Sequence, residues 1–463
     1  MPAPGMLTID QLQAKVTGGE VDTVLTVFPD LQGRFMGKRV MAQFFIDDMV
    51  PGSGGEEGFL ACNYLLAVDS QMNVLPGYRF TNWETGYGDF KAVPDMATLR
   101  MIPWIERTAL VICDLVDEHT SEPIEVSPRQ ILKRQIARAA EQGYVCKAGT
   151  EVEFFLYRDT YEEAAKKGYR DLIPHSDHIL DYHILQTTKD EYIIRDIRLG
   201  MYNAGIPIEF SKGEAGYGQH EINVRYAEAL NTADMQTIFK NGCKEIAHFH
   251  NRAITFMAKP SISDVGSSCH IHSSLWDSTT DRSLMFDADG RDHMSETFRY
   301  YLGGLMAAGQ ELAWMFAHYV NSYKRYQPDS WAPTGIVWGN DNRTCGYRVV
   351  GHGQGMRVES RIPGADTNPY LALAATIAAG LYGIENKIDC GEPFKTNAYT
   401  DPAIERVPWN LADSIRAFEQ SKIGPAAWGD EVQYHLVNTA RQEWVQFNKS
   451  VTDHELRRNF EMI

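Results

Sequence analysis

The first part of the chain alternates apolar and polar side chains over short stretches. Such alternation places apolar side chains on one face of a strand. After a short N-terminal helix, the pattern predicts strands over residues 21–28, 34–45 and 109–115. The glycine-rich segment 51–58 is too flexible for a strand and predicts a mobile loop. Sheet with few helices is therefore expected up to residue 124.

Helical spacing of the apolar residues begins shortly after this point. Pro128 stands just inside a helix start, a position that proline favours because its missing N–H is not needed there. Further helices are expected over residues 233–258 and 295–318, between strands that carry charged side chains. The apolar segment 370–384 is shorter than the roughly 20 residues that a membrane helix needs. It predicts a core helix instead.

Length and composition indicate an enzyme of two domains. The 463 residues exceed what one hydrophobic core usually organises, and the change of pattern places a boundary between residues 1–124 and 125–463. A formal charge of −17 disfavours a nucleic-acid partner, which needs a basic face. The seven cysteines form no Cys-x-x-Cys pair, and residues 1–6 show no secretory signal. A cytoplasmic protein without membrane attachment is expected.

The first candidate site lies in the strand-like run from Thr150 to Leu156. Glu151 and Glu153 are two residues apart, so both side chains point to one face of the strand. Two like charges this close repel each other, and neither is easily buried without a cation or a shifted pKa. A divalent metal is the simplest cation for this place.

Two further motifs could complete a metal site. Glu214 and Glu221 flank a glycine-containing bend that could return both carboxylates to one point, although such a pair, taken alone, is more often solvated on a loop. His270 and His272 share one strand face, although a His-x-His pair is more often satisfied by neighbouring polar groups than by metal. Mixed Glu and His donors without thiolates favour Mg²⁺ or Mn²⁺ over structural zinc.

A set of arginines follows these motifs. Guanidinium groups make paired hydrogen bonds to carboxylates and phosphates, so several of them beside a metal-binding glutamate would form a pocket for polyanions. Any one of them could instead be a solvated charge on a strand. This alternative is weaker for the Arg-x-Glu-x-Arg run, whose three side chains share one face. The candidates are Arg325, Arg343, Arg348, Arg357 and Arg361.

The ordered motifs resemble the glutamine synthetase family over nearly the whole chain. They are Glu-x-Glu-Phe-Phe, Gly-Gln-x-Glu, Gly-Ser-x-x-His-x-His, Asn-Ser-Tyr-Lys-Arg, Asp-Asn-Arg-Thr and Arg-x-Glu-x-Arg-x-Pro. The resemblance implies an α+β fold, with a small N-terminal β-grasp domain and a large catalytic α/β domain built on a curved antiparallel sheet. It also implies a homo-oligomer, a dodecamer of two stacked hexameric rings whose active sites are shared between neighbouring subunits.

The resemblance also assigns roles to residues. It implies one metal held by Glu153, Glu214 and Glu221, and a second held by Glu151, His270 and Glu359. The nucleotide would lie by His272 and Ser274, with its phosphates on Arg348 and Arg357. Arg343 would steady the phosphoryl group during transfer. Glutamate would be held by Gly266, Arg325 and Arg361.

The implied chemistry is ligation driven by ATP and a divalent metal, Mg²⁺ or Mn²⁺. ATP converts the γ-carboxylate of glutamate, a poor acyl donor, to a γ-glutamyl phosphate. Metals and arginines neutralise the charge that moves in this step. An amine then attacks the acyl phosphate and forms a γ-glutamyl amide.

Two departures from the family concern the amine. Members that use ammonia have a flap glutamate after Asn-Ser-Tyr-Lys-Arg, and this chain has Trp331 in that place. These members also have an aspartate in a Phe-Asp-Gly-Ser-Ser context, and segment 58–63 of this chain lacks it. We therefore expect a small organic amine against an aromatic wall formed by Trp331, with a cation–π contact worth roughly 0.5–2 kcal/mol. Members that assimilate ethanolamine or polyamines are the nearest resemblance, and the narrowed pocket favours ethanolamine.

Other interpretations remain open at this point. Another acid could replace the missing ones, so that the protein is a glutamine synthetase that uses ammonia; the candidates are Glu56, Glu57 and Asp69. A catalytically silent assembly or regulatory homologue is less compatible with a complete set of metal ligands. Val265 replaces an asparagine that contacts glutamate in the family. Tyr399 lies near a tyrosine that some members adenylylate, but its flanking residues do not predict this modification.

Overall fold

The structure, a computed structural model, describes residues 4–327 and 330–463. Residues 1–3 and residues 328 and 329 lie outside this description. The first group belongs to the stretch in which no secretory signal is expected, and the second to the segment before Trp331. Within the described residues, no helix has both the length and the apolar character that a membrane crossing requires.

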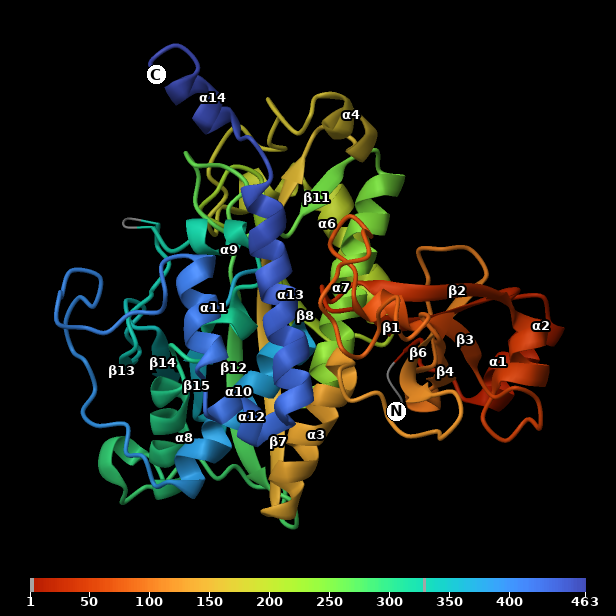
Figure 1. Ribbon diagram of the computed structural model, residues 1–463, viewed down its shortest axis with the longest axis horizontal. Coiled ribbons are helices and arrows are strands. Elements are labelled where there is room, and N and C mark those ends of the chain that lie inside the picture. The colour runs from red at the N-terminus through yellow and green to blue at the C-terminus, as the bar shows by residue number, and fades with distance from the viewer. Residues whose placement is uncertain (1–3, 328–329) are drawn as a thin grey trace.

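The N-terminal part of the chain forms a six-stranded sheet (Figure 1). Its path is β2-β1-β6-β4-β3, with β5 beside β6; β1 and β6 are parallel and the other pairs antiparallel. The strands are β1 Thr23–Pro29, β2 Phe35–Met41, β3 Phe59–Cys62, β4 Asp89–Pro94, β5 Arg100–Met101 and β6 Thr108–Asp117. The helices of this part are α1 Ile9–Thr17 and α2 Ala42–Phe44.

The strand expected over residues 34–45 ends earlier than predicted. Strand β2 stops at Met41, and the chain continues in helical turns to Met49. The reason is visible in burial, because Ala42, Phe45 and Met49 are buried at intervals of three and four residues, a helical period. The segment 51–58 contains neither helix nor regular strand, as expected for a loop.

The rest of the chain is built on a nine-stranded sheet ordered β13-β14-β15-β12-β7-β9-β8, with β10 and β11 beside β7. All pairs are antiparallel except β13 and β14. The strands are β7 Tyr144–Tyr157, β8 Ile208–Gly213, β9 Gln219–Val224, β10 Ala227–Glu228, β11 Ala253–Thr255, β12 Cys269–Asp277, β13 Trp338–Asn340, β14 Tyr347–Val350 and β15 Arg357–Ser360. This architecture confirms the predicted α+β fold class, while the domain boundary at residue 124 stays a prediction.

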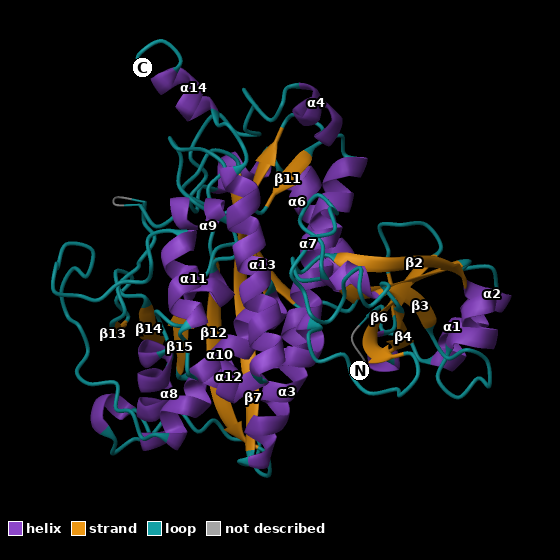
Figure 2. Cartoon of the chain, viewed as in Figure 1, coloured by secondary structure: helices purple, strands orange, loops and turns teal. Residues whose placement is uncertain are grey.

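Helices pack against this sheet, and Figure 2 shows several of them in front of β7, β12 and β15. The apolar helix α10 contacts α3, α7 and α8, and nearly all of its side chains are buried, which confirms the predicted core helix. The helices are α3 Pro128–Glu141, α4 Tyr161–Lys166, α5 Ile184–Thr188, α6 Glu191–Asn203, α7 Ala229–Phe249, α8 Glu296–Ala307, α9 Val320–Lys324, α10 Pro369–Glu385, α11 Leu411–Glu419, α12 Ile423–Trp428, α13 Asp430–Asn448 and α14 Asp453–Asn459.

Helix starts agree with the sequence better than helix ends do. Pro128 is the first residue of α3, as predicted. Helix α7 ends at Phe249 and is followed by β11, whereas the prediction extended to residue 258. Helix α8 ends at Ala307 rather than at residue 318. In both cases apolar residues continue past the helix because the next segment is also buried, so periodicity alone does not mark the end.

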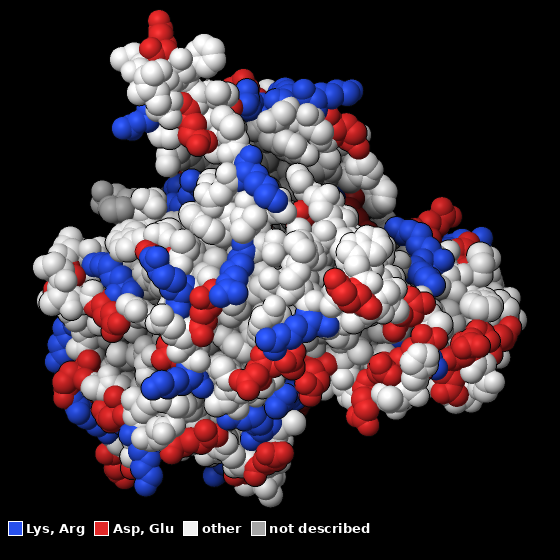
Figure 3. All heavy atoms as spheres, in the orientation of Figure 1, with Lys and Arg blue, Asp and Glu red and all other residues white. Residues whose placement is uncertain are grey.

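A buried arginine joins the two sheets. Arg129 at the start of α3 is 1% exposed and forms ion pairs with Asp95 (2.7 Å), Asp114 (2.5 Å) and Asp234 (2.9 Å). Asp95 and Asp114 belong to the N-terminal part, whereas Asp234 lies on α7. On the outer face shown in Figure 3, acidic and basic side chains are interspersed.

Candidate active site

Strand β7 brings three carboxylates together with its neighbours. Strand β9 is antiparallel to β7 and sets Glu221 opposite Glu153, and the turn after β8 returns Glu214 to the same place. One carboxylate oxygen from each of Glu153, Glu214 and Glu221 lies within 4.8 Å of the others. Glu153 is 8% and Glu221 3% exposed, so these are not solvated surface side chains. We call these three residues the first carboxylate cluster.

The first cluster is crowded with negative charge. Burial, followed by repulsion from Glu214, raises the pKa of Glu153 to about 7. Burial and the charges of Glu151, Glu153 and Glu214 raise the pKa of Glu221 to about 9. Lys212 forms an ion pair with Glu214 and supplies one compensating charge. The motifs do not single out Lys212, although its position two residues before Glu214 indicates a shared side of the chain.

Hydrogen bonds hold Glu153 in place. Its carboxylate accepts from the Ser268 N–H (2.8 Å), the Ser268 hydroxyl (2.6 Å) and the Gln219 side-chain amide (3.2 Å). The same Gln219 amide donates to the Gly266 carbonyl at 3.0 Å. A Cβ on Gly266 would come within 2.6 Å of the Ala258 carbonyl oxygen and 2.8 Å of Arg325 Cγ, so a side chain does not fit there. Gln219 is the glutamine of the Gly-Gln-x-Glu motif, whereas Ser268 is a supporting residue that the sequence motifs do not reveal.

A second cluster lies along the same strand. One atom from each of Glu151, His272 and Glu359 lies within 4.8 Å of the others. His270 Nδ1 is 3.4 Å from both Glu151 and Glu359, and His272 Nε2 is 3.0 Å from Glu151. Both histidines therefore face the predicted second metal site, whereas the resemblance assigns His270 to the metal and His272 to the nucleotide. We call Glu151, His270, His272 and Glu359 the second cluster.

The protonation states in the second cluster suit metal binding. Burial and the charge of Arg361 lower the pKa of His270 to about 4, so its ring is neutral at pH 7 and can act as a ligand. Burial opposes ionisation of Glu151, but hydrogen bonds to His270 and His272 outweigh it and lower the pKa. Burial is likewise outweighed at Glu359, where His270 and Arg361 lower the pKa to about 2. Carboxylate and imidazole donors without a thiolate fit Mg²⁺ or Mn²⁺.

Two of the predicted arginines pair with Glu359, and a third contacts the backbone that follows it. Arg361 Nη1 donates to Glu359 at 2.6 Å, and Arg348 Nη1 does so at 2.9 Å. Arg325 is 3% exposed and donates to the carbonyls of Arg361 (3.1 Å) and Ile362 (2.8 Å). Arg361 Nε is buried and has no hydrogen-bond partner among the described residues. It is therefore a donor that the other described residues leave unsatisfied.

A hollow of about 360 Å³ adjoins the second cluster. Three predicted nucleotide residues line it, namely His272, Ser274 and Arg357, and Arg357 Nε donates to His272 Nδ1 at 3.1 Å. The rings of Tyr226 and Trp276 form another part of the lining and stack with their centroids 6.5 Å apart. Aromatic walls beside a guanidinium suit a purine base and its phosphates. Arg348 does not line this hollow, because it pairs with Glu359 and Asp341.

Comparison with known proteins places this arrangement in a family. The pattern described as "Glutamine synthetase, catalytic domain" matches residues 125–459. The chain belongs to the glutamine synthetase family.

Several relatives of this family are similar over almost the whole chain. Gamma-glutamylethanolamide synthetase of Streptomyces coelicolor is 47% identical over 98% of this chain and 96% of its own length. Glutamate–isopropylamine ligase of a Pseudomonas species is 36% identical over 96% of both chains. A solved GmaS complex with ADP superposes with a TM-score of 0.84 at 29% identity, covering 97% of this chain and 99% of that one.

Two residues expected to take part in the reaction, Arg343 from the resemblance and Trp331 from a departure from the family, do not belong to the clusters. Arg343 is exposed in the loop between β13 and β14, where it lines a surface hollow with Asp292 and Lys395. No hydrogen bond or ion pair within residues 4–327 and 330–463 involves it. Trp331 is 80% exposed with a left-handed φ of 58°. Their roles stay predictions, as does any role for Tyr399.

The first cluster predicts a pH-dependent response to metal. A carboxyl whose pKa is higher in the folded than in the unfolded protein reduces stability as pH rises between the two values. Glu153 and Glu221, raised from 4.5 to about 7 and about 9, should therefore destabilise the metal-free protein between about pH 5 and 9. Added Mg²⁺ or Mn²⁺ removes this penalty, so the rise in Tm on adding metal should grow from pH 6 to pH 9. Thermal unfolding with EDTA or metal measures it; a pH-independent rise would contradict it.

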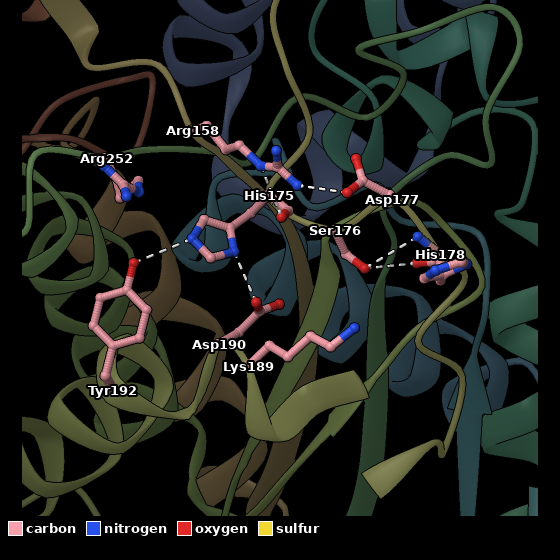
Figure 4. A pocket seen from close by; sticks show the side chains of 9 residues that line it. All are labelled: Arg158, His175, Ser176, Asp177, His178, Lys189, Asp190, Tyr192 and Arg252. Carbon is pink, nitrogen blue, oxygen red and sulfur yellow. Dashed lines mark hydrogen bonds and ion pairs between the residues drawn. The ribbon is translucent and has the colours of Figure 1, made fainter. Parts of the chain in front are cut away.

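A buried carboxylate between two histidines supports the strand that carries Glu221. Asp190 accepts from His175 (Nδ1, 2.7 Å) and lies 2.8 Å from Nε2 of His220, the residue next to Glu221. Figure 4 shows His175 between Asp190 and Tyr192, whose hydroxyl is 3.2 Å from Nε2. The motifs give no sign of Asp190, since its partners are distant in sequence.

Replacing Asp190 by asparagine should destabilise the protein by about 2 kcal/mol at pH 7, because charged hydrogen bonds to two buried imidazoles are lost. Hydrogen bonds to His175 and His220 outweigh burial and hold the pKa of Asp190 well below its usual range. This contribution is present above the unfolded pKa and disappears as pH falls through the folded pKa. Urea unfolding of D190N at pH 7 and pH 3, the second below the usual aspartate pKa, should show a smaller loss at the lower pH. Asp177→Asn, at an exposed position, is the matched control.

Proposed function

We propose that the protein is an ATP-dependent ligase that joins the γ-carboxylate of glutamate to a small organic amine. The observation that carries this proposal is the placement of two carboxylate clusters on one strand beside buried Arg325 and Arg361. The named activities of the Streptomyces and Pseudomonas relatives, both of which join glutamate to an organic amine, support the choice of an amine over ammonia. A cytoplasmic dodecamer of two stacked hexameric rings, without nucleic-acid partner, belongs to the same proposal.

The acidic residues would bind metal ions, and other residues of the site would bind ATP. Glu153, Glu214 and Glu221 would hold one divalent cation, and the second cluster another, with Mg²⁺ proposed and Mn²⁺ as the alternative. When bound, these cations supply positive charge to the phosphates during transfer. The hollow at His272, Ser274 and Arg357 would orient ATP.

Glutamate and the phosphoryl group would be held by the arginines. Arg361 offers its free Nε–H to a carboxylate, and Arg325 lies against the same backbone. An oxygen of the γ-carboxylate attacks the γ-phosphorus of ATP, and ADP leaves. The amine nitrogen then attacks the acyl carbon of γ-glutamyl phosphate, phosphate leaves, and the nitrogen loses a proton. Arg343 would have to reach the transferring phosphoryl group from its exposed loop.

Ethanolamine is the proposed amine. Lys212 pairs with Glu214, and the other carboxylates of the first cluster would face the bound cation, so little negative charge would be left to attract a long polycation. A single-ended amino alcohol would bind as an ammonium ion against an aromatic wall, which Trp331 would supply on closing over the site, and would lose a proton before it attacks. Trp331 would thus contact the substrate and take part in the reaction.

The proposed function is tested by following phosphate release from ATP with glutamate and Mg²⁺. Ammonia, methylamine, ethanolamine, putrescine and spermidine are compared, and products are identified by mass. Turnover with ethanolamine and little with ammonia is the expected result. Efficient glutamine formation would instead identify a glutamine synthetase, and absence of turnover with every amine would indicate a silent homologue.

Trp331→Glu should raise the rate with ammonia and lower the rate with ethanolamine. A carboxylate at this position attracts ammonium, whereas the lost indole removes a contact worth roughly 0.5–2 kcal/mol, or about 2- to 30-fold in kcat/KM for the amine. Trp331→Gln is the matched control, since it removes the ring without adding a charge. An unchanged ratio of the two amine rates in the glutamate variant would remove Trp331 from the amine site.

A further inference from the structure

A cavity of about 590 Å³ lies on the side of the large sheet away from the clusters, between α7, α9, α13 and the turn that follows β1. Figure 1 shows α7 between the N-terminal sheet and α13. We call it the α7–α9 cavity. Its lining includes Arg34, Lys244, Phe256, Lys324, Asp366 and Glu443. None of these residues belongs to the proposed ligase site.

The cavity contains positive charges that the protein does not use. The side chains of Lys244 on α7 and Lys324 at the end of α9 are exposed and form no ion pair and no hydrogen bond with other described residues. Lys244 Nζ lies 5.9 Å from the centre of the Phe256 ring. Arg34, by contrast, is paired with Asp30 at 2.7 Å, and Lys240 donates to the Ala365 carbonyl at 2.8 Å. Lys244 and Lys324 are therefore the two cations available to a ligand.

Acidic groups of the same cavity are also incompletely used. Asp366 Oδ2 accepts from the Ser322 hydroxyl at 2.6 Å, but Asp366 Oδ1 is buried without a hydrogen-bond partner among the described residues. Glu443 on α13 forms no ion pair within them. Burial raises the pKa of both carboxyls, although the charges of Lys240 and Arg325 act against this shift at Asp366. A buried acceptor without a partner calls for a donor from a bound molecule or water.

We propose that the α7–α9 cavity binds a free α-amino acid. Such a molecule carries a carboxylate for Lys244 and Lys324 and an ammonium group for Asp366 and Glu443, and both signs of charge are available on the cavity wall. The aromatic ring of Phe256 offers a wall to the methylene groups of an amino-acid side chain. The volume admits a molecule of this size together with water.

The cavity is lined by helix α9, which directly precedes Arg325, one of the arginines proposed to hold glutamate. Asn321 and Lys324 line it from α9, and Arg325 follows directly, turned toward the carbonyls of Arg361 and Ile362. Asp366 binds Ser322 on the same short helix. An occupant of the cavity therefore contacts the element that positions Arg325. The expectation that it alters the KM for glutamate rests on the proposed function, whereas binding itself does not.

Isothermal titration with L-glutamate, without ATP or amine, tests the proposal. The wild-type chain should bind two equivalents, one in each site, and the Lys244→Met/Glu443→Gln double variant only one. Arg361→Ala should also leave one, this time in the α7–α9 cavity. Lys166→Met, at an exposed position on α4, is the control and should retain two.

Two further probes test the ligand class. Glutarate lacks the ammonium group and ethanolamine lacks the carboxylate, so each should bind the cavity of Arg361→Ala at least tenfold more weakly than L-glutamate. If the wild-type chain binds a single equivalent of L-glutamate and the double variant binds it equally well, the proposal is overturned. Equal affinity for glutarate and L-glutamate overturns the assignment to amino acids. Because titration needs no turnover, a protein without ligase activity would still answer the question.

Discussion

Replacing Glu153 by glutamine should lower kcat for amide formation about 10²- to 10³-fold, the cost typical of removing one group that stabilises transition-state charge. Glutamine keeps the shape of the side chain and can still accept from Ser268, but it removes one of three negative charges from the first cluster. Steady-state phosphate release measures the loss. The exposed Glu118→Gln variant is the control and should keep the wild-type rate.

The same variant separates a catalytic from a structural effect. Since burial and Glu214 oppose ionisation of Glu153, its neutral replacement should leave the metal-free protein as stable as the wild type at pH 8, or more stable. The stabilisation by Mn²⁺ should shrink at the same time. A variant that loses activity together with its metal-free Tm would show that Glu153 supports the fold rather than the reaction.

Arg361→Lys should lower kcat/KM for glutamate about 100-fold, mostly through KM. Lysine keeps the charge but cannot reproduce the guanidinium fork, which here donates to Glu359 through Nη1 and keeps Nε free for a substrate. Rates measured over a range of glutamate concentrations, at saturating ATP and amine, give the effect. KM for ATP is the internal control, because the hollow at His272 and Arg357 does not include Arg361. A wild-type KM for glutamate would exclude Arg361 from the substrate site.

Local sequence patterns were sufficient to predict which side chains share a strand face, because these side chains lie within one short stretch of chain. A strand has a period of two residues, so Glu151 and Glu153, His270 and His272, and Arg357, Glu359 and Arg361 were each expected on one face. The paired strands β7, β12 and β15 bring these side chains together in the structure. The order of the motifs then identified the family and its fold.

Sequence patterns were insufficient to predict which residues meet when the contact joins distant parts of the chain. Glu214 and Glu221 could have been solvated, and only the pairing of β9 with β7 places them beside Glu153. The support from Gln219 and the network at Asp190 arise in the same way. None of these contacts has a local period that a sequence could display.

The amino-acid sequence by itself determined the fold class, the family and the faces of the strands that carry the ligands, because these depend on local spacing and on motif order. Only the tertiary structure decided that Glu214 and Glu221 lie beside Glu153, that both histidines face Glu151, and that the α7–α9 cavity exists. These features depend on strand register and on packing between elements that are far apart in sequence. The same packing sets the burial and the neighbouring charges that shift the pKa values of Glu153, Glu221 and His270.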